Sequence, residues 1–302
     1  MSLILIAEQV LNGLQFGIML FLMAAGLTLI FGVMGLINLA HGSLYMVGAF
    51  AAAAVAGVTG SFVLALAAAM AAAAAAGALI ELLVIRRLYD KDHLDQVLAT
   101  FALILIFSEG TRWLFGSFPL FLNIPEALSG PVSLPGGIEY PLYRLVLILV
   151  GLAVAAGLGL MITRTRIGIQ IRAGENDREM IAALGVDISK LYTLIFALGA
   201  ALAGLAGLFE VTGPAGQITT SFNTGYGFTA IIVAFLGRLN PIGILLAGLL
   251  LALTFIGGEL AQFMLSLPSA SIQVFQGMLL MTLLAMDIFV NYKVVLRKKE
   301  AV

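Results

Sequence analysis

Residues 9–33 read QVLNGLQFGIMLFLMAAGLTLIFGV, a stretch without one charged side chain. Because about 20 predominantly apolar residues suffice to cross a bilayer, this stretch predicts a membrane-spanning helix. Further apolar runs fall at residues 36–58, 61–85, 94–115, 140–162, 191–211, 226–237, 241–260 and 271–290. The run at 226–237 is short, and Pro241 separates it from the next run, so these two are halves of one bent element or separate segments. We therefore expect an all-α polytopic membrane protein with eight or nine transmembrane segments, some of them broken helices.

The composition of the whole chain favours the same class. Of its 302 residues, 62% are hydrophobic and 10% are charged, against roughly 45–50% and 25% in soluble domains. The net charge of −1 gives no basic surplus, so we expect no nucleic-acid partner. Without cysteine, and with only His41 and His93 as imidazoles, we expect no metal site and no cofactor. No phosphate-binding loop ending in Gly-Lys-Ser/Thr is present, so we expect that this chain does not bind ATP by the usual mechanism, and that another subunit supplies the energy if the chain is a driven transporter.

The positions of the cationic residues predict the orientation in the membrane. Thirteen of the fifteen lysines and arginines fall on one side of the predicted spans, and only Arg112 and Arg144 fall on the other. The positive-inside rule makes the side with thirteen cations cytoplasmic. The N-terminus is then outside and the C-terminus cytoplasmic, which requires an odd number of crossings and favours nine. The proline-rich segment 116–141 becomes an outer loop.

Residues 32–43, GVMGLINLAHGS, interrupt two strongly apolar runs with glycines and polar side chains. Broken helices of transporters expose backbone groups to a solute near the bilayer interior. On this interpretation Asn38, His41, Gly42 and Ser43 form a non-helical section of a substrate path. The alternative is a tight turn between two spans, in which Asn38 caps a helix and His41 is an interfacial histidine with its hydrogen bonds satisfied.

The segment 163–190 is the longest internal loop and contains the pattern of a short helix. Asn176 is a good N-cap, Glu179 follows three residues later as in a capping box, and Gly185 suits a left-handed C-terminal position. Met180, Ile181 and Leu184 fall on one face, which predicts an apolar ridge for a groove on another protein. A short amphipathic helix on the lipid surface is the alternative. The residues predicted to contact a partner are Glu175, Asn176, Asp177, Arg178, Glu179, Met180, Ile181, Leu184 and Gly185.

The predicted spans carry little charge near their centres, which argues against an ion-coupled carrier. A stand-alone carrier or channel is thus less favoured, and so is an intramembrane hydrolase, since His41 has Ser43 nearby but no acid in its segment. Small residues recur at helix-packing spacing, as at Gly13 and Gly17 or Gly199 and Gly207, and predict close helix contacts.

Two stretches resemble a known family. Residues 26–32 (GLTLIFG) running into 35–42 (GLINLAHG) closely resemble the amino-terminal signature of the inner-membrane permeases of bacterial branched-chain amino acid ABC importers. Residues 172–185 (RAGENDREMIAALG) are similar to the coupling segment that docks on the ATPase in that family. The resemblance covers residues 1–302 as a single transmembrane permease domain with a coupling loop at 163–190. Arg238 and Leu239 depart from the small-residue turn that is usual in the family.

This resemblance implies the partners and the cargo of the chain. It predicts a non-enzymatic permease subunit in the bacterial inner membrane, paired with a second homologous permease subunit, which in the family is usually a dissimilar one. Two cytoplasmic ATP-binding subunits would drive transport, and a periplasmic solute-binding protein would deliver the solute. The expected cargo is a branched-chain or other hydrophobic amino acid. Relatives of this kind also serve urea, short amides and aromatic acids, which remain alternatives.

Overall fold

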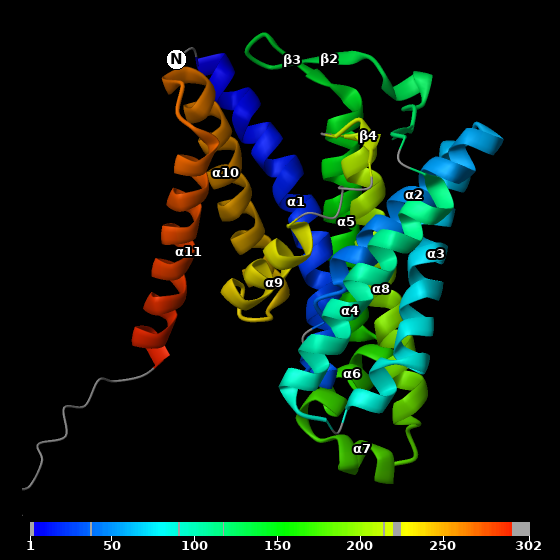
Figure 1. Cartoon of the computed structure of the whole chain (residues 1–302). Coiled ribbons are helices and arrows are strands. Elements are labelled where there is room, and N and C mark those ends of the chain that lie inside the picture. Colours follow the sequence, from blue (N-terminus) through cyan, green and yellow to red (C-terminus); the bar gives the residue numbers. More distant parts are fainter. Residues whose placement is uncertain are drawn as a thin grey trace, which may run out of the picture.

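A computed structural model describes residues 3–36, 38–89, 91–116, 118–213, 215–219 and 225–291. Over these ranges the fold is a bundle of α-helices with a few short strands at one end (Figure 1). The helices are α1 (Leu3–Met34), α2 (His41–Thr59), α3 (Phe62–Leu83), α4 (His93–Phe115), α5 (Leu142–Arg164), α6 (Arg166–Asn176), α7 (Arg178–Ala183), α8 (Ile188–Thr212), α9 (Tyr226–Leu236), α10 (Pro241–Leu265) and α11 (Ser269–Asn291). Two short 3-10 helices are η1 (Ile85–Leu88) and η2 (Glu126–Leu128), and the strands are β1 (Leu120–Phe121), β2 (Pro131–Leu134), β3 (Ile138–Pro141) and β4 (Gln217–Ile218).

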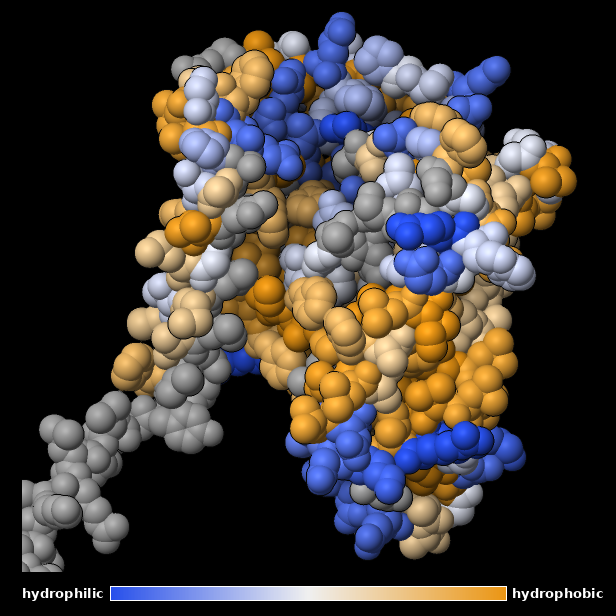
Figure 2. Space-filling model, in the orientation of Figure 1, coloured by the Kyte–Doolittle hydropathy of each residue, from blue (hydrophilic) through white to orange (hydrophobic). Residues whose placement is uncertain are grey.

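The helices confirm the all-α polytopic class. Among the described residues, seven helices are long and apolar enough to cross a membrane, namely α1, α2, α3, α4, α5, α8 and α10. The shorter apolar helix α9 and the 23-residue helix α11 lie at the remaining two predicted segments. The number of crossings, eight or nine, stays a prediction. Figure 2 shows a belt of hydrophobic side chains between hydrophilic ones at the two ends, as a bilayer requires. We call these the hairpin end, which carries β2 and β3, and the α7 end.

Helix α1 is central, because it packs against α5, α8, α9 and α10. Glycines permit its closest contacts. A Cβ atom added to Gly17 would lie 2.7 Å from Cδ2 of Leu249 on α10, and one on Gly13 would lie 2.7 Å from Cδ2 of Leu253. The close contacts predicted from the spacing of Gly13 and Gly17 are therefore confirmed.

Helices α2, α3 and α8 pack just as closely. A Cβ atom on Gly204 of α8 would lie 2.6 Å from the carbonyl oxygen of Ala69 on α3, and one on Gly77 would lie 2.5 Å from Cβ of Ala200. On α2, Gly48 faces Gly204 directly, with no room for a side chain on either residue. Interhelical contact of this kind depends on residues without bulk.

The proline-rich segment 116–141 contains a β-hairpin rather than an irregular loop alone. Strands β2 and β3 pair in antiparallel register with Val132 opposite Tyr140, and β1 pairs with β4. Gly136 and Gly137 form the turn with φ of 95° and 79°, a region that favours glycine. The hairpin closes over one end of the bundle (Figure 1).

Candidate functional site

The interruption after α1 forms a compact turn. Helix α1 ends at Met34, and α2 begins at His41, so of the four predicted path residues only Asn38 lies in non-helical backbone. The prediction of a non-helical section is wrong for His41, Gly42 and Ser43, which form the first turn of α2. The Asn38 side-chain oxygen accepts a hydrogen bond from the backbone N–H of Ala40 at 3.0 Å, a local turn stabilised by its own side chain.

All four predicted path residues are buried. His41 Nε2 lies 3.1 Å from the Met23 carbonyl oxygen, and the side chain is fully buried in the bundle. Gly42 packs against Gly227 in the first turn of α9, where an added Cβ on Gly227 would lie 3.1 Å from Cα of Gly42. These residues fix how α1, α2 and α9 meet, and none of them lines the two cavities, of about 510 and 410 Å³, that lie beside α1, α5 and α10. Solute contact by Asn38, His41, Gly42 or Ser43 stays a prediction.

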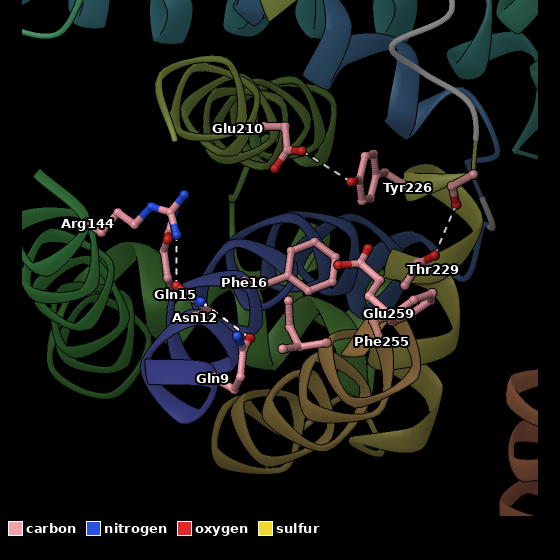
Figure 3. A pocket seen from close by; sticks show the side chains of 12 residues that line it. Gln9, Asn12, Gln15, Phe16, Arg144, Glu210, Tyr226, Thr229, Phe255 and Glu259 are labelled. Carbon is pink, nitrogen blue, oxygen red and sulfur yellow. Dashed lines mark hydrogen bonds between the residues drawn. The ribbon is translucent and has the colours of Figure 1, made fainter. Parts of the chain in front are cut away.

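A polar cavity of about 510 Å³ opens at the hairpin end. It lies among α1, α5, α8, α9 and α10, and Figure 3 shows its side chains converging from these helices. Its charged residues are Arg144, Glu210 and Glu259, and three amides line the α1 side. The complete lining is Gln9, Asn12, Gln15, Phe16, Arg144, Glu210, Gly225, Tyr226, Thr229, Phe255, Ile256 and Glu259. We call this the outer cavity.

Glu210 is the most buried charged residue of the outer cavity, with 4% of its surface exposed. Its Oε1 accepts a hydrogen bond from the hydroxyl of Tyr226 at 3.2 Å (Figure 3). Its Oε2 is buried and has no hydrogen-bond partner among the described residues. Since a buried carboxylate oxygen is costly to leave unpaired, Glu210 is a candidate functional residue of this cavity.

The opposite wall is organised by Asn12. Its side-chain oxygen accepts hydrogen bonds from Arg144 Nη1 at 2.8 Å and from the Tyr140 hydroxyl at 3.1 Å. Burial raises the pKa of Tyr140, against the opposing effect of the Arg144 charge, so the phenol remains a donor. Asn12 thus holds the Arg144 guanidinium at the cavity, across from Glu210 (Figure 3).

The outer cavity was not predicted from the sequence. A signal was present, because Gln9, Asn12 and Gln15 are polar residues three apart in an otherwise apolar run, and side chains at this spacing lie near one another on a helix. Their partners Arg144, Glu210 and Glu259 are far apart in sequence, so only the fold brings them together.

The segment 163–190 is largely helical, but the residue that caps the N-terminus of α7 is not the predicted one. Asp177, and not Asn176, caps α7, since Asp177 Oδ1 accepts the Met180 backbone N–H at 2.9 Å. Asn176 instead ends α6. Gly185 has φ of +88°, which confirms the predicted left-handed position.

The apolar residues of α7 point in two directions. Met180 and Leu184 are 51% and 76% exposed, whereas Ile181 is 3% exposed. The prediction that all three form one exposed ridge is therefore wrong for Ile181, which anchors α7 to its own chain. The exposed polar residues around them are Glu175, Asn176, Asp177 and Glu179.

A buried carboxylate contacts the start of α8, the helix that follows this segment. Glu81, at the end of α3, is fully buried and accepts four hydrogen bonds, at 3.1 and 2.9 Å from Arg86, 2.9 Å from Tyr89 and 2.7 Å from Thr193. The hydrogen bond with Glu81 raises the pKa of Arg86, and burial together with the Glu81 charge raises that of Tyr89. Thr193 belongs to the start of α8, so this cluster ties α3 and η1 to the helix that follows α7.

A helical membrane bundle with a polar cavity at one end and short amphipathic helices at the other is compatible with a transport permease. The chain belongs to the family described as branched-chain amino acid transport system, permease component, whose model matches residues 9–284. It is therefore the inner-membrane permease of an ABC importer and not an enzyme.

Individual relatives agree with this family. The chain is 30% identical to the high-affinity branched-chain amino acid transport system permease protein BraD of Pseudomonas aeruginosa, over 81% of this chain and 83% of the relative. It is 28% identical to the permease LivH of Escherichia coli strain K12, over 82% and 83%. A glucose ABC transporter permease of Haloferax volcanii is 33% identical over 59% of this chain, but the match spans only 48% of that relative. No solved structure matches this chain.

Proposed function

We propose that this permease carries branched-chain or related hydrophobic amino acids across the bacterial inner membrane. It would act with a second homologous permease subunit, two cytoplasmic ATP-binding subunits and a periplasmic solute-binding protein. The names of BraD and LivH support this cargo and the family supports these partners.

We infer that the α7 end is cytoplasmic and the hairpin end periplasmic. Arg164, Arg166, Arg172 and Lys190 lie in or beside α5–α8 at the α7 end, and the positive-inside rule supports this orientation. The N-terminus would then lie outside and the C-terminus in the cytoplasm. The outer cavity would open toward the delivering protein.

The observation that carries the proposal is the pairing of charges in the outer cavity. A free amino acid is a zwitterion, so its site needs an acid for the ammonium and a cation for the carboxylate. Glu210 and Glu259 supply the acids, and Arg144 supplies a guanidinium that suits a carboxylate. A neutral sugar requires neither charge.

A sugar is the second candidate. The amides Gln9, Asn12 and Gln15 and the aromatic rings of Phe16 and Tyr226 supply hydrogen bonds and flat apolar faces that also suit a sugar, and the match to the glucose permease supports it. Leucine and glucose uptake should therefore be measured side by side.

Coupling to ATP hydrolysis would run through α7. Met180 and Leu184 are its exposed apolar anchors, and Glu175, Asn176, Asp177, Arg178 and Glu179 would surround them at the interface, with Gly185 ending the helix. Exposed apolar side chains among polar neighbours are typical of a docking surface.

The cargo is tested by ATP-driven uptake in proteoliposomes that contain the complete transporter. We expect leucine uptake by the native chain, and a loss of about 10-fold or more with Glu210→Gln, because one hydrogen bond to a charged group is worth about 1.5–3 kcal/mol. Glu139→Gln, an exposed acid at the same end, is the matched control and should transport normally. Uptake of glucose but not leucine would overturn the proposal.

A further inference from the structure

A second cavity of about 410 Å³ lies toward the α7 end, bounded by α1, α5, α6 and the turn between α9 and α10. Its volume falls within the roughly 300–1,000 Å³ of small-molecule sites. It shares α1, α5 and α10 with the outer cavity but is separate from it, with a different set of lining residues. We call it the inner cavity.

The walls of the inner cavity divide into an apolar part and a charged part. Leu29, Leu158, Ile162, Ile171 and Ile244 contribute branched aliphatic side chains, of which Leu29, Ile171 and Ile244 are buried. The charged part is formed by Arg172 and Glu175 of α6 and by Arg238. The outer cavity, with its amides, has no comparable aliphatic wall.

Backbone conformation positions the charged residues on both sides of the inner cavity. Gly168, in the first turn of α6, packs directly on the Ile162 carbonyl and sets the bend from α5 into α6. Across the cavity, Arg238 and Leu239 both adopt left-handed backbone, with φ of 53° and 57°. Non-glycine residues in this conformation are strained and persist where the surrounding structure holds them. These two residues are the ones that depart from the usual small-residue turn, and Arg238 lines the cavity as a result.

We propose that the inner cavity binds a hydrophobic α-amino acid on the α7 side of the membrane. Arg172 and Arg238 would receive its carboxylate, Glu175 its ammonium, and the aliphatic wall its side chain. Arginine suits a carboxylate geometrically, and the carboxylate of Glu175 supplies the partner that an ammonium group requires. The identity of the amino acid rests on the proposed function, whereas the charged and aliphatic walls are features of the cavity.

The probe is a leucine analogue that carries a photoreactive diazirine on its side chain. It is applied to the complete transporter in lipid nanodiscs without ATP, and the labelled residues are mapped by mass spectrometry. We expect labels on residues 158–171 and 25–33, removed by excess leucine. Glu175→Gln and Arg238→Gln should each reduce labelling about 10-fold. Arg112→Gln, an exposed arginine at the hairpin end, is the matched control and should leave the labelling unchanged.

Two outcomes would overturn the inner site. One is the absence of leucine-competed labels on these segments. The other is stronger labelling by a diazirine fatty acid that leucine does not displace, which would make the cavity a lipid site. Leucine uptake measured on the same preparation separates the two proposals. Uptake without labelling of the inner cavity refutes the inner site alone, and competed labelling without uptake supports the inner site while refuting the proposed cargo.

Discussion

Replacing Glu81 by glutamine should destabilise the protein far more than replacing an exposed acid. The carboxylate is fully buried, and each of its oxygens accepts two hydrogen bonds. Oε1 accepts from Arg86 Nε and Tyr89, and Oε2 accepts from Arg86 Nη2 and Thr193. A glutamine presents only one oxygen, so two of the four bonds are lost and the other two become bonds to a neutral acceptor.

The magnitude follows from these contacts. Hydrogen bonds to a charged group contribute about 1.5–3 kcal/mol each, so two lost bonds set an upper limit of about 6 kcal/mol. Part of this free energy is recovered, because the Arg86 side chain is 36% exposed and can form hydrogen bonds with water. Thr193 can donate its single hydroxyl hydrogen to the Ser189 carbonyl instead, at 3.0 Å. We therefore expect a loss of about 2–4 kcal/mol in the free energy of unfolding.

The assay is unfolding by sodium dodecyl sulfate in mixed micelles, followed by circular dichroism. Glu109→Gln is the matched control, since Glu109 pairs with Arg112 at 3.3 Å but is 69% exposed. An exposed ion pair of this kind contributes about 0–1 kcal/mol. If Glu81→Gln costs no more than Glu109→Gln, the buried cluster does not stabilise the fold and the reasoning is wrong.

Three further predictions concern packing, coupling and orientation. Gly204→Leu should lower the free energy of unfolding by about 1–3 kcal/mol or more through overpacking against Ala69. Gly157→Leu, at a position with open space around it, is the control and should be near neutral in the same assay. Equal effects of the two substitutions would contradict the packing argument. Leu184→Asp should weaken co-purification of the ATPase about 10-fold or more while membrane abundance stays normal, because burying a leucine at an interface is worth about 1.5–3 kcal/mol; undiminished co-purification would remove Leu184 from the interface. In this cysteine-free chain, Ser129→Cys should react with an impermeant thiol reagent in spheroplasts and Ser189→Cys should not, and the reverse pattern would invert the orientation.

Much of the fold can be predicted from the sequence, because the positions and ends of helices depend on local sequence patterns. The apolar runs predict the positions of the long helices, and Gly13 and Gly17 predict the close contact of α1 with a neighbour. Gly185 predicts the end of α7 from its tolerance of positive φ. The neighbouring cap shows the limit of such rules, since Asn176 and Asp177 are both good caps and the continuation of α6 to Asn176 decides between them.

The candidate site is much harder to predict from the sequence, because its residues are far apart in the chain. Glycine and polar residues after α1 predict correctly that the helix is interrupted there, but they do not tell where α2 begins or whether His41 faces a cavity or the Met23 carbonyl. Likewise, periodicity places Ile181 beside Met180 and Leu184 without showing that α7 turns Ile181 inward. The pairing of Arg144 with Asn12 and of Glu210 with Tyr226 depends on tertiary packing alone.

The central position of α1 has a consequence for biosynthesis. This helix is made before its partner α10, which begins only at Pro241, after the 206 residues that follow Met34. At about 5–20 residues per second, roughly 10–40 s pass before α10 is synthesised. During that time Gln9, Asn12 and Gln15, which later line the outer cavity, lack the neighbours that α10 contributes to that cavity. Because polar groups in hydrocarbon are costly, the nascent α1 must be shielded by the insertion machinery or held at the membrane surface until the later helices arrive.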